Sequence, residues 1–304
     1  MENALEKLVL GTVQFGLEYG INNQNGKPDR KKSLEMLSFA YKKGITTFDT
    51  AFAYGDAEEI LGEFLQNHNF NKKIKIITKL KPNVLSELET GKTTYDIIAA
   101  NLNESLKRLK RTYVDGYLLH TPAYINNKEV VVTLSKLKDQ GLVRNIGVSI
   151  YEEEDAINAA KIDEVDYIQI PYSIFDQRLD KTDFFKLAKK NGKKIFARSA
   201  FLQGLFFMAE EKIPSHLQNA KVYLRELDKI INKYNLTRQQ AALTFSLKNK
   251  NIDYIVFGVD NQEQLKEDIS IVEQNIDCEQ CIKELKDKFI NIEKNIIFPS
   301  LWKK

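Results

Sequence analysis

The sequence predicts an α/β protein with the architecture of a (β/α)8 TIM barrel. Short runs rich in Val, Ile and Phe recur along the 304 residues, and a stretch with helical periodicity follows each run. Eight strands alternating with eight helices is the order expected of a closed parallel barrel, and barrels commonly reach this length. No linker or low-complexity segment divides the chain. Residues 1–304 are therefore expected to form a single barrel domain with a C-terminal helical tail.

Each expected strand is a short apolar run that ends at a polar or small residue. The expected strands are Leu8–Thr12, Thr46–Thr50, Lys75–Lys79, Gly116–His120, Asn145–Val148, Tyr167–Ile170, Lys194–Ala197 and Tyr254–Phe257. The expected helices between them are Arg30–Lys43, Ala57–Gln66, Thr94–Leu109, Lys128–Gln140, Glu153–Ala160, Thr182–Lys190, Asn219–Tyr234 and Gln262–Val272.

Local signals mark several helix ends. Gly44, Gly141 and Gly192 follow helical runs that end in Lys or Gln, which is where a helix C-terminus favours glycine. Thr237–Gln240 resembles a capping box and is expected to open an additional helix before the last strand. The tail from Cys278 to Lys304 is expected to be helix-like.

The charges and the cysteines exclude several classes of protein. Lys and Arg number 45 against 42 Asp and Glu, so a net charge of +3 predicts no nucleic-acid or membrane partner. No apolar stretch approaches the roughly 20 residues of a membrane span, and the N-terminus lacks a signal peptide's features, so a cytoplasmic protein is expected. Cys278 and Cys281 have metal-ligand spacing, but without a second pair they are expected to be free thiols, and no metal is expected. The oligomeric state stays open.

Four residues that can exchange a proton with a carbonyl lie at or just after the ends of expected strands. Asp49 ends one strand and Tyr54 follows it, while Lys79 and His120 end the next two. In a parallel barrel, the C-terminal ends of the strands converge on one mouth, where catalytic groups gather. An acid, a phenol, a lysine and an imidazole brought together there would form a proton-donating centre.

These residues lie in blocks that resemble the aldo-keto reductase superfamily, whose bacterial members the chain is most similar to. The blocks run in order through most of the chain: Leu10–Gly16, Phe48–Gly55 followed by Glu58–Gly62, Ile76–Lys79, Tyr117–His120 and Gly141–Ser149. The resemblance implies a barrel enzyme that reduces an aldehyde or ketone with NAD(P)H. It also implies a catalytic tetrad of Asp49, Tyr54, Lys79 and His120.

The chemistry of the four side chains agrees with that implication. A tyrosine phenol has a pKa of about 10, so it is a poor acid at neutral pH. A nearby ammonium such as that of Lys79 favours the phenolate and is expected to lower the pKa of Tyr54. Asp49 would keep Lys79 charged and oriented, and His120 would hydrogen-bond the substrate oxygen. Tyr54 would then donate the proton as a hydride reaches the carbonyl carbon.

The cofactor is expected to bind without a glycine-rich loop, because no G-x-G-x-x-G follows the first strand. By resemblance, the cofactor contacts are Gly11, Thr12, Ser149, Gln169, Arg198, Ser199, Phe201, Gly204, Gly258, Gln264 and Asp268. The chain departs from the family at five positions. Ile150 replaces an asparagine, Arg198 an aromatic ring, and Asp268 an adenine-binding asparagine. Gly258 and Gln264 replace cations that clamp a 2′-phosphate. NADP(H) is slightly favoured as the family's usual cofactor, and NAD(H) is the alternative.

The substrate is less clearly indicated. Phe15, Tyr19, Phe52 and Trp302 are candidates for an apolar or sugar-stacking pocket, although each is equally explained as a core or surface aromatic. The polar segment of residues 22–29 is expected to cover the site or bind a polar substrate. The form of the first block resembles reductases of surface-sugar synthesis, so a keto-sugar or sugar nucleotide is one hypothesis. A regulatory or sensor subunit that binds the nucleotide with little turnover remains the alternative function.

Overall fold

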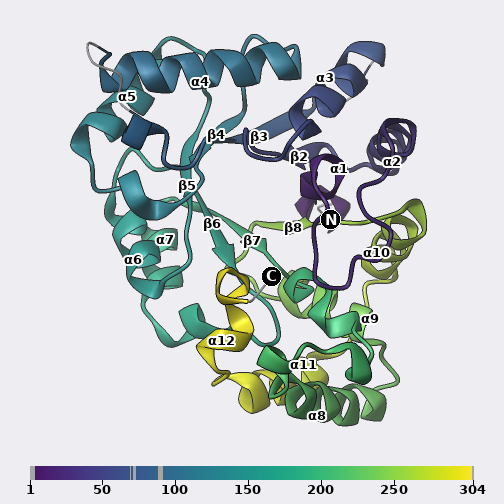
Figure 1. The fold of residues 1–304 in the computed structure, drawn as a ribbon. Helices are drawn as coiled ribbons and strands as arrows, with labels where there is room; N and C mark the ends of the chain where they lie inside the picture. The colour runs from purple at the N-terminus through teal and green to yellow at the C-terminus, as the bar shows by residue number, and fades with distance from the viewer. Residues whose placement is uncertain (1–3, 69, 71–72, 88–91, 303–304) are drawn as a thin grey trace.

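The computed structural model describes residues 4–68, 70, 73–87 and 92–302. Eight strands pair in parallel in the order of the sequence, and β1 pairs with both β2 and β8, which closes the barrel (Figure 1). The prediction of a (β/α)8 barrel is confirmed.

The strands lie within one residue of their expected bounds. They are β1 (Leu8–Gly11), β2 (Thr47–Asp49), β3 (Lys75–Leu80), β4 (Gly116–Leu119), β5 (Ile146–Ser149), β6 (Tyr167–Pro171), β7 (Lys194–Arg198) and β8 (Tyr254–Phe257). Their apolar side chains explain this agreement, because nearly every strand position is buried between the interior and the helices.

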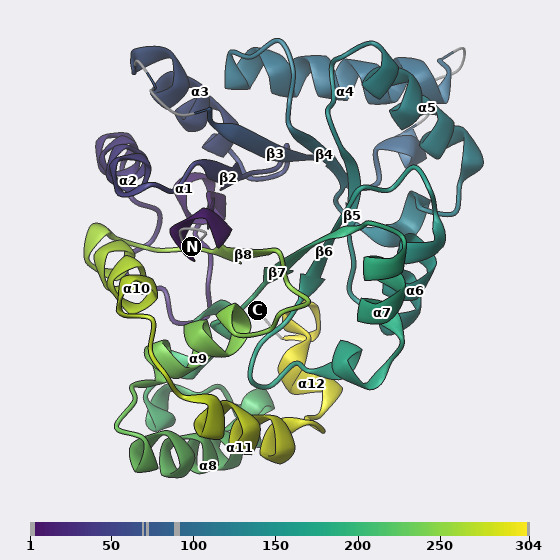
Figure 2. The ribbon, with the colours of Figure 1, turned by 180° about the vertical axis from the view of Figure 1, so that it is seen from behind.

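The helices surround the strands, as the two opposite views in Figures 1 and 2 show. The helices of the barrel layer are α2 (Arg30–Lys43), α3 (Ala57–Asn67), α4 (Thr94–Leu109), α5 (Lys128–Asp139), α6 (Glu153–Lys161), α7 (Phe184–Lys190), α8 (Ala220–Lys233) and α10 (Gln262–Gln274). The additional helices are α1 (Val13–Gly16), α9 (Arg238–Leu247), α11 (Glu279–Phe289) and α12 (Lys294–Ile297).

The helix-end signals read from the sequence lie at the ends of the observed helices. Gly44 adopts a left-handed φ of 106° at the end of α2. Thr237 forms the capping box of α9, in which its side chain accepts from the amide of Gln240. None of the helices in the described part of the chain is long and apolar enough to cross a membrane.

Three expected elements differ. α10 ends at Gln274 rather than at Val272. α7 begins at Phe184 rather than Thr182, because Thr182 has an extended backbone and its Oγ1 accepts a hydrogen bond from the Phe184 amide. The tail is two helices rather than one, since residues 290–293 separate α11 from α12.

The interior of the barrel is filled by a small apolar cluster contributed by five strands. Its buried members are Val9, Ile77, Leu118, Phe196 and Val256. A larger core lies between the strands and the helices. The interior is therefore a packed core and not a channel.

Candidate active site

The candidate site forms the layer directly above the interior cluster. Side chains alternate across a strand, so the residue two positions after an inward-facing residue also faces inward. Counting two residues onward from the five cluster members gives Gly11, Lys79, His120, Arg198 and Gly258. Single strands thus supply both the apolar floor and the polar residues above it.

A buried ion pair links β2 to β3. The Lys79 Nζ atom lies 2.6 Å from Oδ2 of Asp49 and donates to the Thr50 carbonyl at 2.9 Å. Nε2 of Gln169, on β6, donates to Oδ1 of Asp49 at 2.8 Å. Because Lys79 is only 1% exposed, its charge depends on these oxygen atoms. The three contacts fix the lysine in one orientation.

Tyr54 is held by a close approach of the end of α1 to the loop after β2. A Cβ atom at Gly16 would lie 1.7 Å from the Tyr54 carbonyl oxygen, and one at Gly55 would lie 2.4 Å from the Gly16 carbonyl oxygen. Gly55 also has a φ of +54°, a conformation that glycine tolerates best. Only glycine at both positions permits this placement of Tyr54.

The structure brings the four residues of the expected tetrad together. The Lys79 Nζ atom lies 5.0 Å from the centre of the Tyr54 ring. The rings of Tyr54 and His120 meet edge to face, with centroids 5.5 Å apart and planes at 87°. Among the described residues, Nδ1 of His120 is buried and has no hydrogen-bond partner. A carbonyl oxygen could therefore approach a phenol and an imidazole at the same place.

Burial dominates the protonation of these groups. It raises the pKa of Tyr54 far above its usual value, and the Asp49 charge raises it further while Arg198 lowers it. This direction is opposite to the one expected from Lys79 alone, because burial of the phenol outweighs the nearby cations. Burial also lowers the pKa of Lys79, and it lowers that of His120 to about 3, helped by Lys79 and Arg198. At neutral pH, Tyr54 thus keeps its proton and His120 is uncharged.

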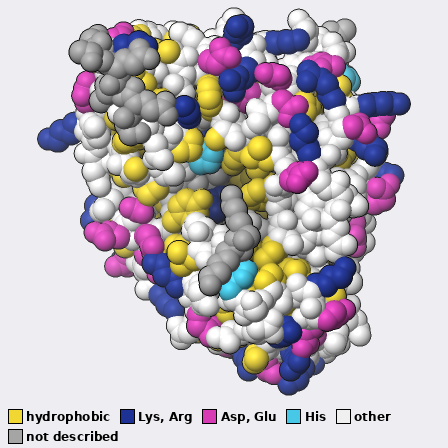
Figure 3. Space-filling model, in the orientation of Figure 1, with side chains coloured by type: hydrophobic (Ala, Val, Ile, Leu, Met, Phe, Trp, Pro, Cys, Tyr) yellow, Lys and Arg dark blue, Asp and Glu magenta, His cyan; other side chains and the backbone are white. Residues whose placement is uncertain are grey.

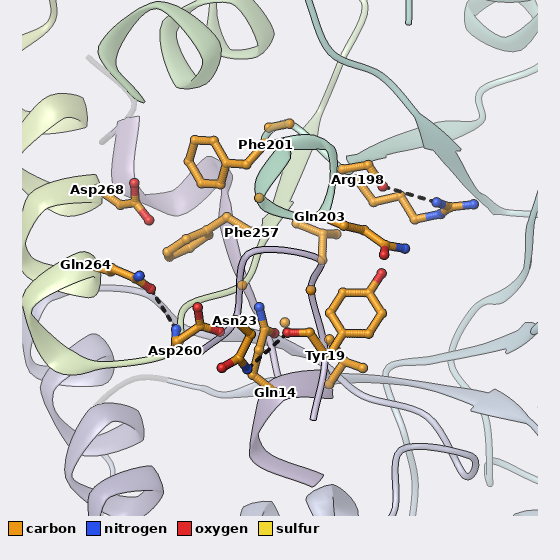
Figure 4. A pocket seen from close by; sticks show the side chains of 18 of the residues that line it. Gln14, Tyr19, Asn23, Arg198, Phe201, Gln203, Phe257, Asp260, Gln264 and Asp268 are labelled. Atoms are coloured by element: carbon orange, nitrogen blue, oxygen red, sulfur yellow. Dashed lines mark hydrogen bonds between the residues drawn. The ribbon is translucent and has the colours of Figure 1, made fainter. Parts of the chain in front are cut away.

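A cavity extends from the tetrad to the start of α10. At one end it is lined by Asp49, Tyr54 and Gln169, and at the other by Asp260, Gln264 and Asp268. Figure 4 shows Asp260, Gln264 and Asp268 on one side of the cavity and Tyr19 and Arg198 on the other. In Figure 3, hydrophobic side chains gather around a hollow near the centre of the face that Figure 1 presents.

Most of the expected cofactor residues line this cavity. They are Gly11, Gln169, Arg198, Ser199, Phe201, Gly204, Gly258, Gln264 and Asp268. Thr12 and Ser149 do not line it: Oγ1 of Thr12 donates to the Asp49 carbonyl at 3.1 Å, and Ser149 is 3% exposed at the end of β5.

The segment after α1 closes one side of the cavity. Tyr19, Gly20, Asn22 and Asn23 line it, and the Ile21 amide donates to the Gln203 carbonyl at 3.0 Å. Part of the polar segment expected to cover the site therefore does so. Sequence reasoning missed this contact partner, because nothing local links residues 21 and 203.

Other lining residues were also not expected. They are Val13, Gln14, Ala200, Gln203, Phe207, Gln239, Val256, Phe257 and Glu267. A signal existed for Glu267, since residues three or four apart share a helix face and Gln264, Glu267 and Asp268 have that spacing. Gln239 comes from α9, which had no such signal.

Of the candidate substrate aromatics, only Tyr19 lines the cavity. Phe15 is fully buried in the core. The Phe52 ring faces Arg108, whose Cζ lies 4.2 Å from the ring centre. Trp302 packs against the core and donates from Nε1 to the Asn295 carbonyl at 3.0 Å. These three aromatics stabilise the surrounding structure and do not form the described wall of the cavity.

Arg198 occupies the position where many family members have an aromatic ring. Its Nη2 donates to the Ile150 carbonyl at 3.1 Å, and its Nη1 donates to Oγ of Ser199 at 3.2 Å. Its Cζ lies 4.6 Å from the centre of the Tyr151 ring. Arg198 is thus the one cationic side chain among the described residues of the cavity wall.

Acidic residues, histidines and cysteines are the side chains that most often hold a metal ion. Among the described residues, no three of them lie close enough together to do so. Cys278 and Cys281 are free and buried, and burial raises the pKa of Cys281 to about 12, which disfavours the reactive thiolate.

Comparison with known proteins identifies the family. Residues 7–287 match the model of the Aldo/keto reductase family. The NADH-specific methylglyoxal reductase of Escherichia coli K12 is 25% identical over 301 residues, covering 90% of this chain and 91% of that protein. The aldo-keto reductase YhdN of Bacillus subtilis 168 is 29% identical over 160 residues, covering 52% of this chain and 48% of that protein.

Solved structures show the same fold. The holo form of the aldo-keto reductase AKR11C1 from Bacillus halodurans superposes with a TM-score of 0.72 at 21% sequence identity, covering 92% of this chain and 91% of that one. The match to the family model, the closed barrel and the tetrad geometry agree, and this chain belongs to the aldo/keto reductase family.

Proposed function

We propose that this protein reduces an aldehyde or a ketone to an alcohol with a nicotinamide dinucleotide, and that Tyr54 donates the proton. One observation carries the proposal: the cavity that begins at Tyr54 and Asp49 continues as a single space to the start of α10. A dinucleotide is an elongated ligand with two chemically different ends. A cavity with proton-donating residues at one end suits it.

The residues present fit such a cofactor. Oε1 of Gln14 is buried in the cavity wall and has no hydrogen-bond partner within the described structure, so it is available to a ligand donor. Gln169 donates to Asp49 through Nε2, which leaves its Oε1 for a carboxamide. Ser199, Phe201 and Gly204 follow β7 and also line the cavity. When bound, a reduced nicotinamide supplies the hydride for the carbonyl carbon.

The tetrad would then act on the carbonyl oxygen. Neutral His120 donates a hydrogen bond to that oxygen and fixes its position. Tyr54 holds its proton at neutral pH and releases it as negative charge develops on the oxygen. Lys79, held by Asp49, supplies positive charge beside the phenol. This charge stabilises the negative charge that develops on the Tyr54 oxygen as the proton leaves, which happens only in the transition state.

For the substrate, we propose a small polar carbonyl compound. The cavity wall contains Tyr19, which lies close enough to Tyr54 to interact with it electrostatically, and its hydroxyl suits a hydroxylated or dicarbonyl compound. The name of the E. coli relative makes methylglyoxal one candidate. A keto-sugar or sugar nucleotide is the second.

The test is a binding titration followed by turnover. NADH and NADPH are each titrated into the protein by calorimetry, and methylglyoxal, simple aldehydes and ketoses are then added while absorbance at the nicotinamide band is followed. Saturable binding with carbonyl-dependent oxidation of the nucleotide supports the reductase. Tight binding without turnover across the panel would instead indicate a nucleotide sensor, and no binding would refute the proposal.

The matched control is Tyr113→Phe, which removes one hydroxyl from a ring that lies between Arg111 and Arg144 and outside the cavity wall. We expect this variant to retain full activity. The Tyr54→Phe variant removes the same group inside the cavity, and we expect its turnover to fall by a factor of about 100 or more.

A further inference from the structure

We propose that the far end of the cavity selects NADH over NADPH by excluding a 2′-phosphate. The inference rests on the proposed function, because the position of Tyr54 sets the direction of the cofactor. If the nicotinamide lies beside Tyr54, the adenosine lies at the other end, where β8 meets α10. The 2′-position of its ribose is where the two nucleotides differ.

The far end of the cavity is lined by acidic side chains, and none of the described residues that line it is a lysine or an arginine. Asp260, Glu267 and Asp268 line it, and Arg198 lies at the other end, beside the tetrad. Figure 4 shows Asp268 and Phe201 above the Phe257 ring and Asp260 below it. A phosphate placed among these carboxylates would be repelled, whereas a ribose hydroxyl can donate a hydrogen bond to any of them.

The nearby cations are engaged elsewhere. Arg238, one residue before Gln239, binds Asp228 through Nε and Nη2 at 2.6 Å each and donates to the Phe206 carbonyl. Lys266 lies on α10, but its Nζ is 6.0 Å from the centre of the Phe39 ring, toward α2. Neither side chain is part of the described cavity wall.

The start of α10 has side-chain caps that occupy part of its anion-binding potential. A helix N-terminus attracts phosphate because its first amides lack partners. Here the Gln264 amide already donates to Oδ1 of Asn261 at 2.9 Å, and the Asp260 amide donates to Oε1 of Gln264 at 2.7 Å. Side chains of the loop and helix therefore already occupy two amides of this turn.

Asp268 adds the buried member of this set. It is 1% exposed, and its Oδ1 accepts a hydrogen bond from Nε2 of Gln239 at 2.8 Å. Its other oxygen remains available for a donor from the ligand. The contact links α9 to α10 and holds the carboxyl at the cavity wall. Replacement of the family's asparagine by Asp268 thus favours a ligand that donates hydrogen bonds and carries no added charge.

The experiment compares dissociation constants by calorimetry at pH 8 for NADH and NADPH, and for ADP and its 2′-phosphorylated form. We expect NADH to bind at least tenfold more tightly than NADPH, and ADP to show the same preference, because the discrimination lies at the adenosine end. Equal affinities, or tighter binding of NADPH, would overturn the inference while leaving the reductase proposal intact. If neither dinucleotide binds, the proposed function itself fails.

A charge-removal variant tests the cause. Asp260→Asn combined with Glu267→Gln keeps the shape of the wall and removes two charges. We expect the NADH-to-NADPH preference to shrink at least threefold through tighter NADPH binding. The control is Glu263→Gln, an exposed residue of α10 outside the cavity wall, which should leave the preference unchanged. An unchanged preference in the double variant would refute the electrostatic cause.

Discussion

Asp268 is a buried acid whose charge costs folding stability. Burial raises its pKa from 3.8 to about 7. Because the folded-state pKa lies above the unfolded value, the folded protein binds this proton more tightly than the unfolded chain does. The charge therefore costs little near pH 4, and the cost grows as the pH rises until it levels off above pH 7. A shift of about 3 pKa units corresponds to about 4 kcal/mol at pH 8.

The Asp268→Asn variant removes this cost and keeps the oxygen that accepts from Gln239. We expect its free energy of unfolding at pH 8 to exceed that of the wild type by up to about 4 kcal/mol, and the gain to shrink as the pH is lowered toward 4. Urea unfolding followed by circular dichroism at pH 4.5, 6 and 8 measures it. Asp277→Asn, at an exposed residue after α10, is the control. A variant that gains nothing at pH 8, or gains equally at every pH, would refute the reasoning.

Three further predictions concern the tetrad and its support. Lys79→Met leaves the Asp49 carboxylate buried without its cation, so urea unfolding should show a loss of about 3–5 kcal/mol, and adding Asp49→Asn should recover part of it; fully additive losses would contradict a coupled pair. Gly16→Ala inserts a Cβ against the Tyr54 carbonyl, so turnover should fall and stability should drop by about 1–3 kcal/mol; wild-type behaviour in both would show that Tyr54 is placed otherwise. His120 has a pKa of about 3 and stays neutral above pH 5. The pH profile of turnover should therefore show no step near pH 6.5 that comes from His120. A step near pH 6.5 in the wild type that disappears in His120→Gln would contradict the neutral state of this imidazole.

The sequence predicted the fold because its signals are local. Each strand is a run of buried Val, Ile and Phe, and each tetrad residue lies at a fixed distance from such a run. Lys79 follows Ile77 by two residues and His120 follows Leu118 by two, so the period of the strand alone places both above the barrel floor. The bounds of α2 and α4 also follow from local caps at Asp29 and Thr93.

The features that sequence reasoning missed depend on contacts between distant segments. The hydrogen bond from Ile21 to Gln203 has no local signal, and Gln203 has a left-handed φ of 53° that only the assembled loop explains. The pKa of Tyr54 was expected to fall because a lysine was nearby, but its direction is set by the burial of the ring. Burial is a property of the whole fold. The same holds for Trp302, whose place against the core depends on where the tail packs.

The central claim is that Tyr54 donates the proton to a substrate carbonyl. The carbonyl compound and a nicotinamide dinucleotide would share the protein's cavity. The most direct measurement is the single-turnover rate of NADH oxidation by saturating carbonyl substrate in the wild type and in Tyr54→Phe, with the dissociation constant of NADH measured for both. We predict a rate lower by a factor of about 100 or more, with affinity for NADH changed by less than twofold. An unchanged rate in Tyr54→Phe would contradict the account.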